Sequence, residues 1–251
     1  MTETQRRVLR LSGADTRDFL QNLVTNDVRR LSEGPVYAAL LTPQGKYLAD
    51  FLLVADGDDV LLDVAEPLAA GLMQRLSMYR LRADVQITDS GLSVFRGTGP
   101  APEGAVTDPR HPALGWRLYG AAAGDDGTDW AAIRTAHVIP ETGIELTPDT
   151  YILEAGFERL HGVDFRKGCY VGQEVTARMK HKTELRKGLL AVTVEGSAPV
   201  GTEILAGDRP AGTLYTQSGG RGIAYLRFDR TDAPLQAGEA RVAPRPADPE
   251  S

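Results

Sequence analysis

Cysteine is almost absent from this sequence, because Cys169 is the only one among 251 residues. A single thiol excludes an internal disulfide and gives no sign of an oxidising compartment. It also excludes a self-contained iron–sulfur site of the usual kind, which needs four thiolates. We therefore expect a cytoplasmic protein that carries no cluster of that kind.

Other features with a clear signature are missing too. The four histidines are scattered, and no two have the short spacing of zinc ligands, so we predict no metal site. A net charge of −6 argues against stable nucleic-acid binding, which needs a clustered positive field. There is no phosphate-binding loop, and no apolar run is long enough to cross a bilayer, so we expect no membrane insertion.

The pattern of helices and strands predicts an α+β fold in consecutive parts. Residues 1–96 mix helices with a strand meander, and residues 97–182 form a middle lobe. From about Lys187 onward, short apolar runs are cut by Gly, Pro and Asp at near-regular intervals, which is typical of a small all-β domain. We assign a small β-barrel to residues 183–245 and a disordered tail to residues 246–251.

Local signals mark several of these elements. The first helix is expected to begin after a cap at Ser12 or Asp15, and a later one after Asp129. Residues 36–65 hold apolar runs separated by two turns, which predicts three strands in a meander. Pro67 suits the first turn of the helix that follows.

The stretch "RKGCYVGQEVTAR", Arg166 to Arg178, is the main candidate for chemistry. We expect Cys169 at or just before the first turn of a helix, where free amides, the helix dipole and nearby Lys167 would favour a thiolate. The surroundings are basic in an otherwise acidic chain, which suggests an anion pocket or a lowered thiol pKa. The residues alone also allow two purely structural interpretations. Free cysteines often only pack, and basic runs are often solvated faces.

The octapeptide "KGCYVGQE" resembles the signature of the YgfZ family, folate-binding proteins related to the glycine cleavage T-protein, an aminomethyltransferase. Three further stretches resemble the wider superfamily and occur in the expected order. They are "FLQNLVTNDV", "ALLTPQGKYLADFLL" and "YILEAGFERLHGVDFRKGCY". The resemblance covers about residues 8–230.

This resemblance implies a ring of three lobes around a central hole that holds tetrahydrofolate, with the small β-barrel as the last lobe. It implies that Glu154, in "LEAG", binds the pterin, since a carboxylate can accept two hydrogen bonds from an aminopyrimidine edge. On the residues alone, Glu154 reads as an exposed acid at a strand end. The resemblance also assigns Arg186 and Tyr170 to folate binding.

Asp50, in "GKYLADF", lies where T-protein-like transferases carry the acid that acts on folate or on the substrate amine. Its presence keeps a transfer reaction in view, although an aspartate in a strand is common. The rival hypothesis is therefore a folate-dependent aminomethyl or methyl transferase, in which Asp50 is the acid/base and Cys169 is incidental.

The function that the resemblance implies is a tetrahydrofolate-binding protein that supports iron–sulfur cluster assembly or repair in client enzymes. In this hypothesis Cys169, helped by Lys167, performs transient chemistry on a one-carbon unit, sulfur or iron. A third hypothesis is a folate-binding regulatory module without turnover. A transferase should depend on Asp50 and a repair factor on Cys169, whereas the module should tolerate the loss of either.

Overall fold

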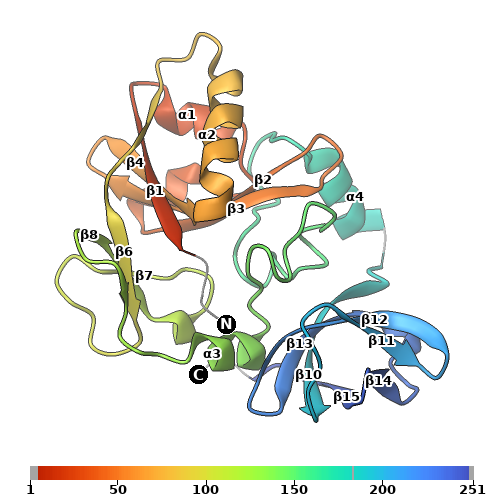
Figure 1. Ribbon diagram of the computed structural model, residues 1–251. Coiled ribbons are helices and arrows are strands. Elements are labelled where there is room, and N and C mark those ends of the chain that lie inside the picture. The colour runs from red at the N-terminus through yellow and green to blue at the C-terminus, as the bar shows by residue number, and fades with distance from the viewer. Residues whose placement is uncertain (1–4, 183, 249–251) are drawn as a thin grey trace. The chain divides into compact units, whose positions relative to one another are not determined.

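The structure is a computed structural model that describes residues 5–182 and 184–248. The chain forms two compact units (Figure 1), and both include segments from distant parts of the sequence. The units are Met1–Thr128 with Glu158–Ala177 (unit 1), and Asp129–Phe157 with Arg178–Ser251 (unit 2).

Unit 1 contains an antiparallel sheet of order β2-β3-β4-β1-β5. Its strands are β1 (Arg6–Ser12), β2 (Val36–Leu41), β3 (Tyr47–Asp56), β4 (Asp59–Ala65) and β5 (Gln86–Asp89). Three helical segments accompany them: α1 (Thr16–Gln21), the 3-10 helix η1 (Val28–Ser32) and α2 (Glu66–Arg80). The predicted meander is confirmed, because β2, β3 and β4 pair in succession.

The helices bury one face of this sheet. Leu9 and Phe51 of the sheet are fully buried in one apolar cluster with Leu20 of α1 and Leu72 of α2. Burying a side chain such as Phe51 stabilises the fold by about 1.5–3 kcal/mol. Successive side chains of a strand point to opposite faces of the sheet. Because Phe51 points into this cluster, Asp50 and its cross-strand partner Ala39 face away from it.

The helix starts are only partly as predicted. Pro67 lies in the first turn of α2, as expected. Asp15 stands at the N-cap of α1, but its side chain makes no capping bond there and instead accepts the backbone amide of Asp84 at 2.8 Å. It therefore ties α1 to the segment before β5.

A smaller sheet of order β7-β8-β6-β9 completes the strands of unit 1. Its strands are β6 (Ser93–Gly97), β7 (Val106–Thr107), β8 (Trp116–Gly120) and β9 (Gly124–Asp125), with the 3-10 helix η2 (Pro112–Leu114) between β7 and β8. The helix α4 (Gln173–Lys182) begins in unit 1 and ends in unit 2. The middle lobe that we predicted as one segment is thus divided between the units.

Unit 2 is a closed barrel of order β10-β13-β12-β11-β14-β15, preceded by α3 (Trp130–His137). The barrel strands are β10 (Lys187–Glu195), β11 (Thr202–Ala206), β12 (Arg209–Ser218), β13 (Arg221–Arg227), β14 (Leu235–Ala237) and β15 (Ala240–Arg245), with the 3-10 helix η3 (Phe228–Arg230) after β13. The predicted barrel is confirmed. So is the cap of α3, where Asp129 accepts the amide of Ala132 at 2.9 Å.

The beginning of the expected tail is held in place. Asp248 donates its backbone amide to the carbonyl of Ala136, and its carboxylate pairs with Arg221 and Arg245. The prediction of disorder is therefore wrong for this residue, two of whose partners, Ala136 and Arg221, are remote in sequence. Residues 249–251 lie outside the described residues. Within residues 5–182 and 184–248, no helix is both long and apolar enough to span a membrane.

Candidate functional site

Cys169 lies on an exposed loop in unit 1, and its thiol is free. The following helix, α4, begins only at Gln173, so Cys169 lies outside its first turn. The influence of a helix dipole falls off within that turn. Activation of this thiol by the start of the helix therefore stays a prediction, and the structure shows that Cys169 is exposed.

Lys167 makes contacts that the sequence analysis did not predict. Its side chain is buried, and its ammonium donates to three backbone carbonyls, those of Gln21 (2.7 Å), Val24 and Asn26 (3.1 Å). An ammonium has three N–H donors, so no donor is left for a thiolate at Cys169. Lys167 instead anchors the motif to the segment that links α1 to η1.

The burial of Lys167 affects its charge. Desolvation lowers the pKa of this lysine to about 8, although nearby aspartates oppose the shift. Its ammonium also lies 5.3 Å from the centre of the Tyr170 ring. These contacts fix Lys167 and Tyr170, which lie on either side of the exposed thiol in the sequence.

Tyr170 is itself buried, and its hydroxyl has no hydrogen-bond partner among the described residues. Burial raises the pKa of Tyr170 to about 12, and Thr176, which counteracts this shift, gives its own hydroxyl proton to the carbonyl of Gly172. A phenol in this position remains a hydrogen-bond donor in need of an acceptor. The assignment of Tyr170 to folate binding stays a prediction.

Gly172 sets the approach of the motif to the β2–β3 turn. It has a left-handed φ of 82°, and a Cβ atom there would lie 2.6 Å from the carbonyl oxygen of Thr42. Only glycine allows this contact. The loop that carries the thiol is therefore fixed at Lys167 on one side and at Gly172 on the other.

Asp50 is buried in β3, on the sheet face opposite the helices. Its two carboxylate oxygens accept the hydroxyls of Tyr47 (2.6 Å) and Tyr37 (3.0 Å). Burial, reinforced by the charge of Asp50, raises the pKa of Tyr37 well above its ordinary value. Tyr37 therefore stays protonated and continues to donate to Asp50.

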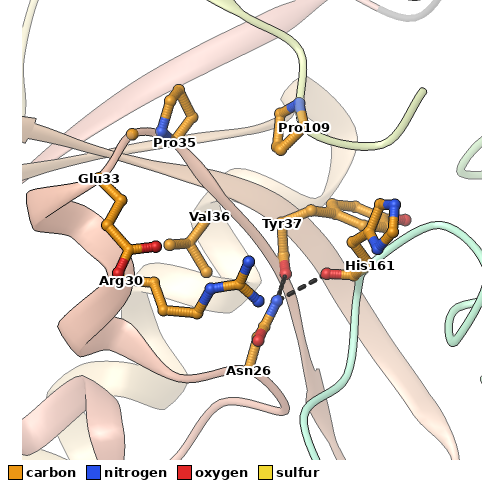
Figure 2. A pocket seen from close by; sticks show the side chains of 9 residues that line it. Asn26, Arg30, Glu33, Pro35, Val36, Tyr37, Pro109 and His161 are labelled. Atoms are coloured by element: carbon orange, nitrogen blue, oxygen red, sulfur yellow. Dashed lines mark hydrogen bonds between the residues drawn. The ribbon is translucent and has the colours of Figure 1, made fainter. Parts of the chain in front are cut away.

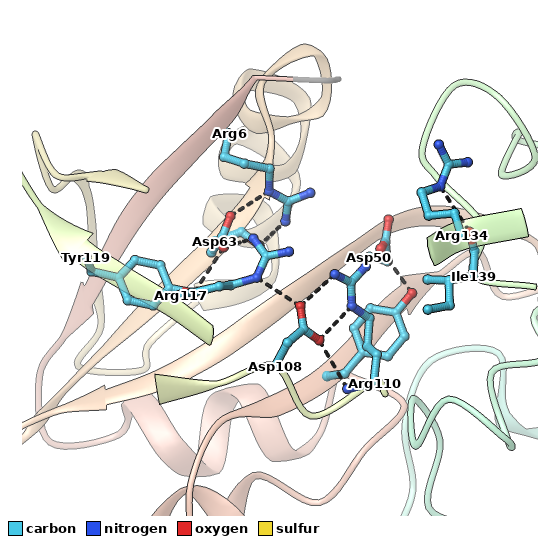
Figure 3. A network of polar contacts seen from close by, with 10 residues as sticks. Arg6, Asp50, Asp63, Asp108, Arg110, Arg117, Tyr119, Arg134 and Ile139 are labelled. Carbon is cyan, nitrogen blue, oxygen red and sulfur yellow. Dashed lines mark hydrogen bonds and ion pairs between the residues drawn. The ribbon is translucent and has the colours of Figure 1, made fainter. Parts of the chain in front are cut away.

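A chain of buried ion pairs, which the sequence analysis missed, extends from Arg6 to Arg110 near Asp50 (Figure 3). Asp63 accepts from Arg6 at 2.6 Å and from Arg117 at 2.9 Å. Arg117 also donates to Asp108 at 3.0 Å, and Asp108 binds Arg110 through two bonds of 2.7 and 2.9 Å. Positive and negative side chains thus alternate along the whole chain.

The arginines keep these acids charged. Burial by itself raises the pKa of Asp63, but Arg6 and Arg117 outweigh it and hold that pKa below its ordinary value. The chain ends at Arg110, whose guanidinium carbon lies 5.4 Å from the centre of the Tyr37 ring. Asp50 is therefore connected through Tyr37 to a pre-arranged set of charges.

One sequence signal could have found this chain. Asp63 interrupts the apolar run "VLLDVA", and Arg117 interrupts "WRLYG". Charged side chains are almost never fully buried unless they are paired. A buried strand with a single charged residue therefore predicts a partner, although it does not say which one.

The other predicted residues belong to unit 2. The carboxylate of Glu154 is nearly buried and accepts the hydroxyl of Tyr225 at 2.6 Å, while its backbone carbonyl accepts the amide of Leu189. Burial and this hydrogen bond raise the pKa of Tyr225 above its ordinary value. Glu154 is therefore a buried carboxylate held by a hydrogen bond, and the interpretation as an exposed acid at a strand end is wrong.

Arg186 has an exposed side chain just before β10. Its backbone carbonyl accepts the amide of Phe228 at 2.9 Å, which fixes the main chain but not the guanidinium. The structure thus brings together Lys167 and Tyr170 in unit 1. Among the described residues it shows no group of three or more His, Cys, Asp and Glu side chains that could hold a metal ion.

The fold is similar to that of a solved structure, and part of the chain matches a known protein family. The chain superposes over its full length on 87% of the glycine cleavage system aminomethyltransferase T from Bartonella henselae, with a TM-score of 0.78 and 12% sequence identity. The fold is that of an aminomethyltransferase. Residues 186–249 match the family described as the CAF17 C-terminal β-barrel domain, which agrees with the barrel of unit 2.

Curated relatives give a second comparison. The chain is 32% identical over 75% of its length to the iron–sulfur cluster assembly factor IBA57 homolog of Mycosarcoma maydis, of which it spans only about half, 55%. It is 29% identical to the IBA57 factor of Mus musculus and 28% to that of Homo sapiens, in each case over 92% of this chain and 78% of the relative. These relatives are all named as iron–sulfur cluster assembly factors.

The relatives also correct one prediction. All three are named as mitochondrial proteins, so the assignment of this chain to the cytoplasm is wrong. The assignment rested on a single cysteine, which argues only against an oxidising compartment. That argument cannot distinguish the cytoplasm from another reducing compartment.

Proposed function

We propose that this chain is an iron–sulfur cluster assembly factor of the IBA57 type that works with bound tetrahydrofolate. The observation that carries the proposal is the exposed thiol of Cys169 on a loop that is anchored on both sides. Similarity to named assembly factors over most of the chain supports it. The finer relationship to the YgfZ proteins, carried by "KGCYVGQE", belongs to the same proposal.

In this proposal Cys169 acts on cargo rather than as part of a resident centre. A stable cluster site needs several ligands, and a single accessible thiolate suits a brief attachment of iron or sulfur while the partner supplies the other ligands. The anchoring by Lys167 and Gly172 keeps the thiol at a fixed place on the surface. The partners are therefore client iron–sulfur enzymes or other assembly factors.

The residues present fit a folate. Glu154 uses one carboxylate oxygen for Tyr225, and its other oxygen is available to the aminopyrimidine edge of a pterin. Arg186, which belongs to the same unit, offers an exposed cation for the glutamate tail. Bound tetrahydrofolate would supply a one-carbon carrier, and the task of these residues is to bind and orient it.

Asp50 argues against a transferase as the main activity. Both of its oxygens already accept tyrosine hydroxyls, and an acid/base would have to give up one of these bonds in order to exchange a proton with a substrate. Its geometry suits a fixed negative charge. The transferase remains the rival hypothesis that the experiment must exclude.

The experiment compares two variants in cells that lack the wild-type chain. Cys169→Ser and Asp50→Asn are expressed at matched levels, and the activity of a host iron–sulfur enzyme is measured. We expect loss of that activity with Cys169→Ser and retention with Asp50→Asn. The opposite result would support the transferase, and retention in both would support a passive folate-binding module.

Folate binding needs its own test. Binding of tetrahydrofolate to the purified chain is measured by equilibrium dialysis for wild type, Glu154→Gln and the exposed control Glu174→Gln. We expect Glu154→Gln to weaken binding by at least about tenfold, since a charge-assisted pair is lost. Equal affinity in all three proteins would remove Glu154 from the proposal.

A further inference from the structure

A pocket of about 300 Å³ lies in unit 1 beside the edge strand β2 (Figure 2). It is lined by Asn26, Arg30, Glu33, Gly34, Pro35, Val36, Tyr37, Pro109 and His161. Its size is at the small end of the range for ligand sites. None of these residues was singled out as a site residue by the sequence analysis.

Two charged side chains line this pocket without pairing with any described residue. Within residues 5–182 and 184–248, the side chains of Arg30 and Glu33 make no hydrogen bond or ion pair, with each other or with a third residue. The nearby Asp27, which could have neutralised Arg30, instead pairs with Arg29 at 2.6 Å. One guanidinium and one carboxylate therefore face the same small space.

The pocket floor is built and does not depend on these two charges. The amide group of Asn26 donates to the carbonyl of Tyr37 at 2.8 Å and to the carbonyl of His161 at 2.6 Å (Figure 2). Thr25 binds the carbonyl of Gly162 at 2.6 Å, which fixes the same loop. His161, which also lines the pocket, has a left-handed φ of 56°.

The remaining wall is aliphatic. Figure 2 shows Pro35 and Pro109 on the side opposite Asn26, with Val36 between the charged side chains and the rest of the pocket. A purely anionic ligand would meet the carboxylate of Glu33, and a purely cationic one the guanidinium of Arg30. A ligand that carries both charges matches both groups.

We propose that this pocket binds a free α-amino acid with a small aliphatic side chain. Its carboxylate pairs with Arg30, its ammonium with Glu33, and its side chain lies against Pro35, Val36 and Pro109. This inference does not depend on the proposed function, because neither Cys169 nor Glu154 lines the pocket. It adds a small-molecule site to unit 1.

The test is a titration of the purified full chain with L-valine, followed by backbone amide shifts in NMR spectra. We expect saturable shifts in the segment from Arg30 to Val36. N-acetyl-L-valine, which lacks the ammonium, and L-valinamide, which lacks the carboxylate, should each bind at least about tenfold more weakly.

Two variants assign the charges. Arg30→Gln and Glu33→Gln should each lower the affinity for L-valine by at least about tenfold, whereas Arg75→Gln, an equal charge change on α2, should leave it unchanged. All three positions are exposed, so the fold should persist, and unchanged spectra outside the pocket verify this. Absence of saturable shifts would overturn the proposal. So would equal binding of N-acetyl-L-valine, or tighter binding by Glu33→Gln, since either would mean a plain anion site.

Discussion

Each unit buries an arginine among acidic side chains, and the two clusters serve different ends. In unit 1, Arg117 bridges Asp63 and Asp108, and the chain continues through Arg110 to the ring of Tyr37, a direct partner of Asp50. In unit 2, Arg134 binds Glu145 at 2.6 Å and Glu141 at 2.8 Å. The first cluster leads to a candidate site residue.

The second cluster joins pieces of backbone. Arg134 of α3 also donates to the carbonyl of Ile139, and Glu145 accepts both the amide and the hydroxyl of Thr216 in β12. Helix, loop and barrel strand are thereby tied together. The predicted ligand residue Glu154 makes its side-chain bond elsewhere, to Tyr225.

The hydrogen bonds of Asp50 and Glu154 indicate which of these two acids could bind a ligand. Both oxygens of Asp50 accept tyrosine hydroxyls, and one of these tyrosines, Tyr37, lies against the buried Arg110, so Asp50 suits a permanent electrostatic role. Glu154 has one bond and a second oxygen that can meet a ligand. Burial alone therefore does not distinguish these two acids, whereas the number of hydrogen bonds that each carboxylate accepts does.

The largest expected effect is from Asp63→Ala, which breaks the unit 1 chain between Arg6 and Arg117. The buried network then loses a carboxylate that pairs with both arginines, and Arg117 keeps only Asp108, so we expect the free energy of unfolding to fall by about 3–5 kcal/mol. Chemical denaturation measures this. The matched control is Asp56→Ala, whose partner Arg10 is at the surface, and it should cost less than about 1 kcal/mol. Similar losses in the two variants would mean that the chain contributes no more than a surface pair.

Lys167→Met should have the next largest effect. It leaves the carbonyls of Gln21, Val24 and Asn26 without their donor, and we expect a loss of about 2–3 kcal/mol in the free energy of unfolding. The rate of Cys169 alkylation in the native state should stay within about threefold of wild type, because the ammonium does not serve the thiol.

The exposed neighbour Arg166 provides the control for that variant. Arg166→Met removes the same charge from the same loop without removing a buried donor, so stability should hardly change. If Lys167→Met left stability unaltered but slowed alkylation by tenfold or more, the anchoring role would be wrong and the original thiol-activating role would be right.

The contacts of Lys167 also show what sequence could and could not reveal. Local features were predictable: the cap at Asp129 depends on residues a few positions away, and the barrel follows from turn residues at regular spacing. The partners of Lys167 are 141 to 146 residues away along the chain. No local pattern states where such a side chain will donate its protons.

The candidate site was predicted in the same uneven way. The residues alone singled out Cys169, and the resemblance added Asp50 and Glu154. The structure shows an exposed thiol and two hydrogen-bonded carboxylates at those positions. The support of Asp50 by Arg110 could not be foreseen, since it depends on the pairing of segments that are far apart. The pocket at Arg30 was hidden for the same reason.

Tyr47→Phe and Tyr225→Phe compare the two acids directly, with a smaller effect than the variants above. Tyr47→Phe leaves one oxygen of buried Asp50 without a donor and should cost about 1–2 kcal/mol. Tyr225→Phe removes a bond in a partly exposed site and should cost less than about 1 kcal/mol, because water can replace the lost donor at Glu154. Denaturation midpoints of both variants test this order. A larger loss for Tyr225→Phe would reverse our distinction between a held acid and an available one.

The smallest expected effect is a pH dependence at the edge of the amino-acid pocket. A hydrogen bond from Arg29 lowers the pKa of Asp27 from 3.8 to about 2, in spite of partial burial. Since the folded pKa is the lower one, this pair stabilises the fold fully above pH 3.8 and loses its contribution as the pH falls towards 2. Arg29→Gln should therefore reduce the thermal midpoint slightly at pH 6, and the difference from wild type should shrink as the acid range is crossed. Arg30→Gln, an equal charge change without a carboxylate partner, should show no such convergence. The effect is small because the Arg29 side chain is 76% exposed and solvent screens the pair, so added salt should diminish it further.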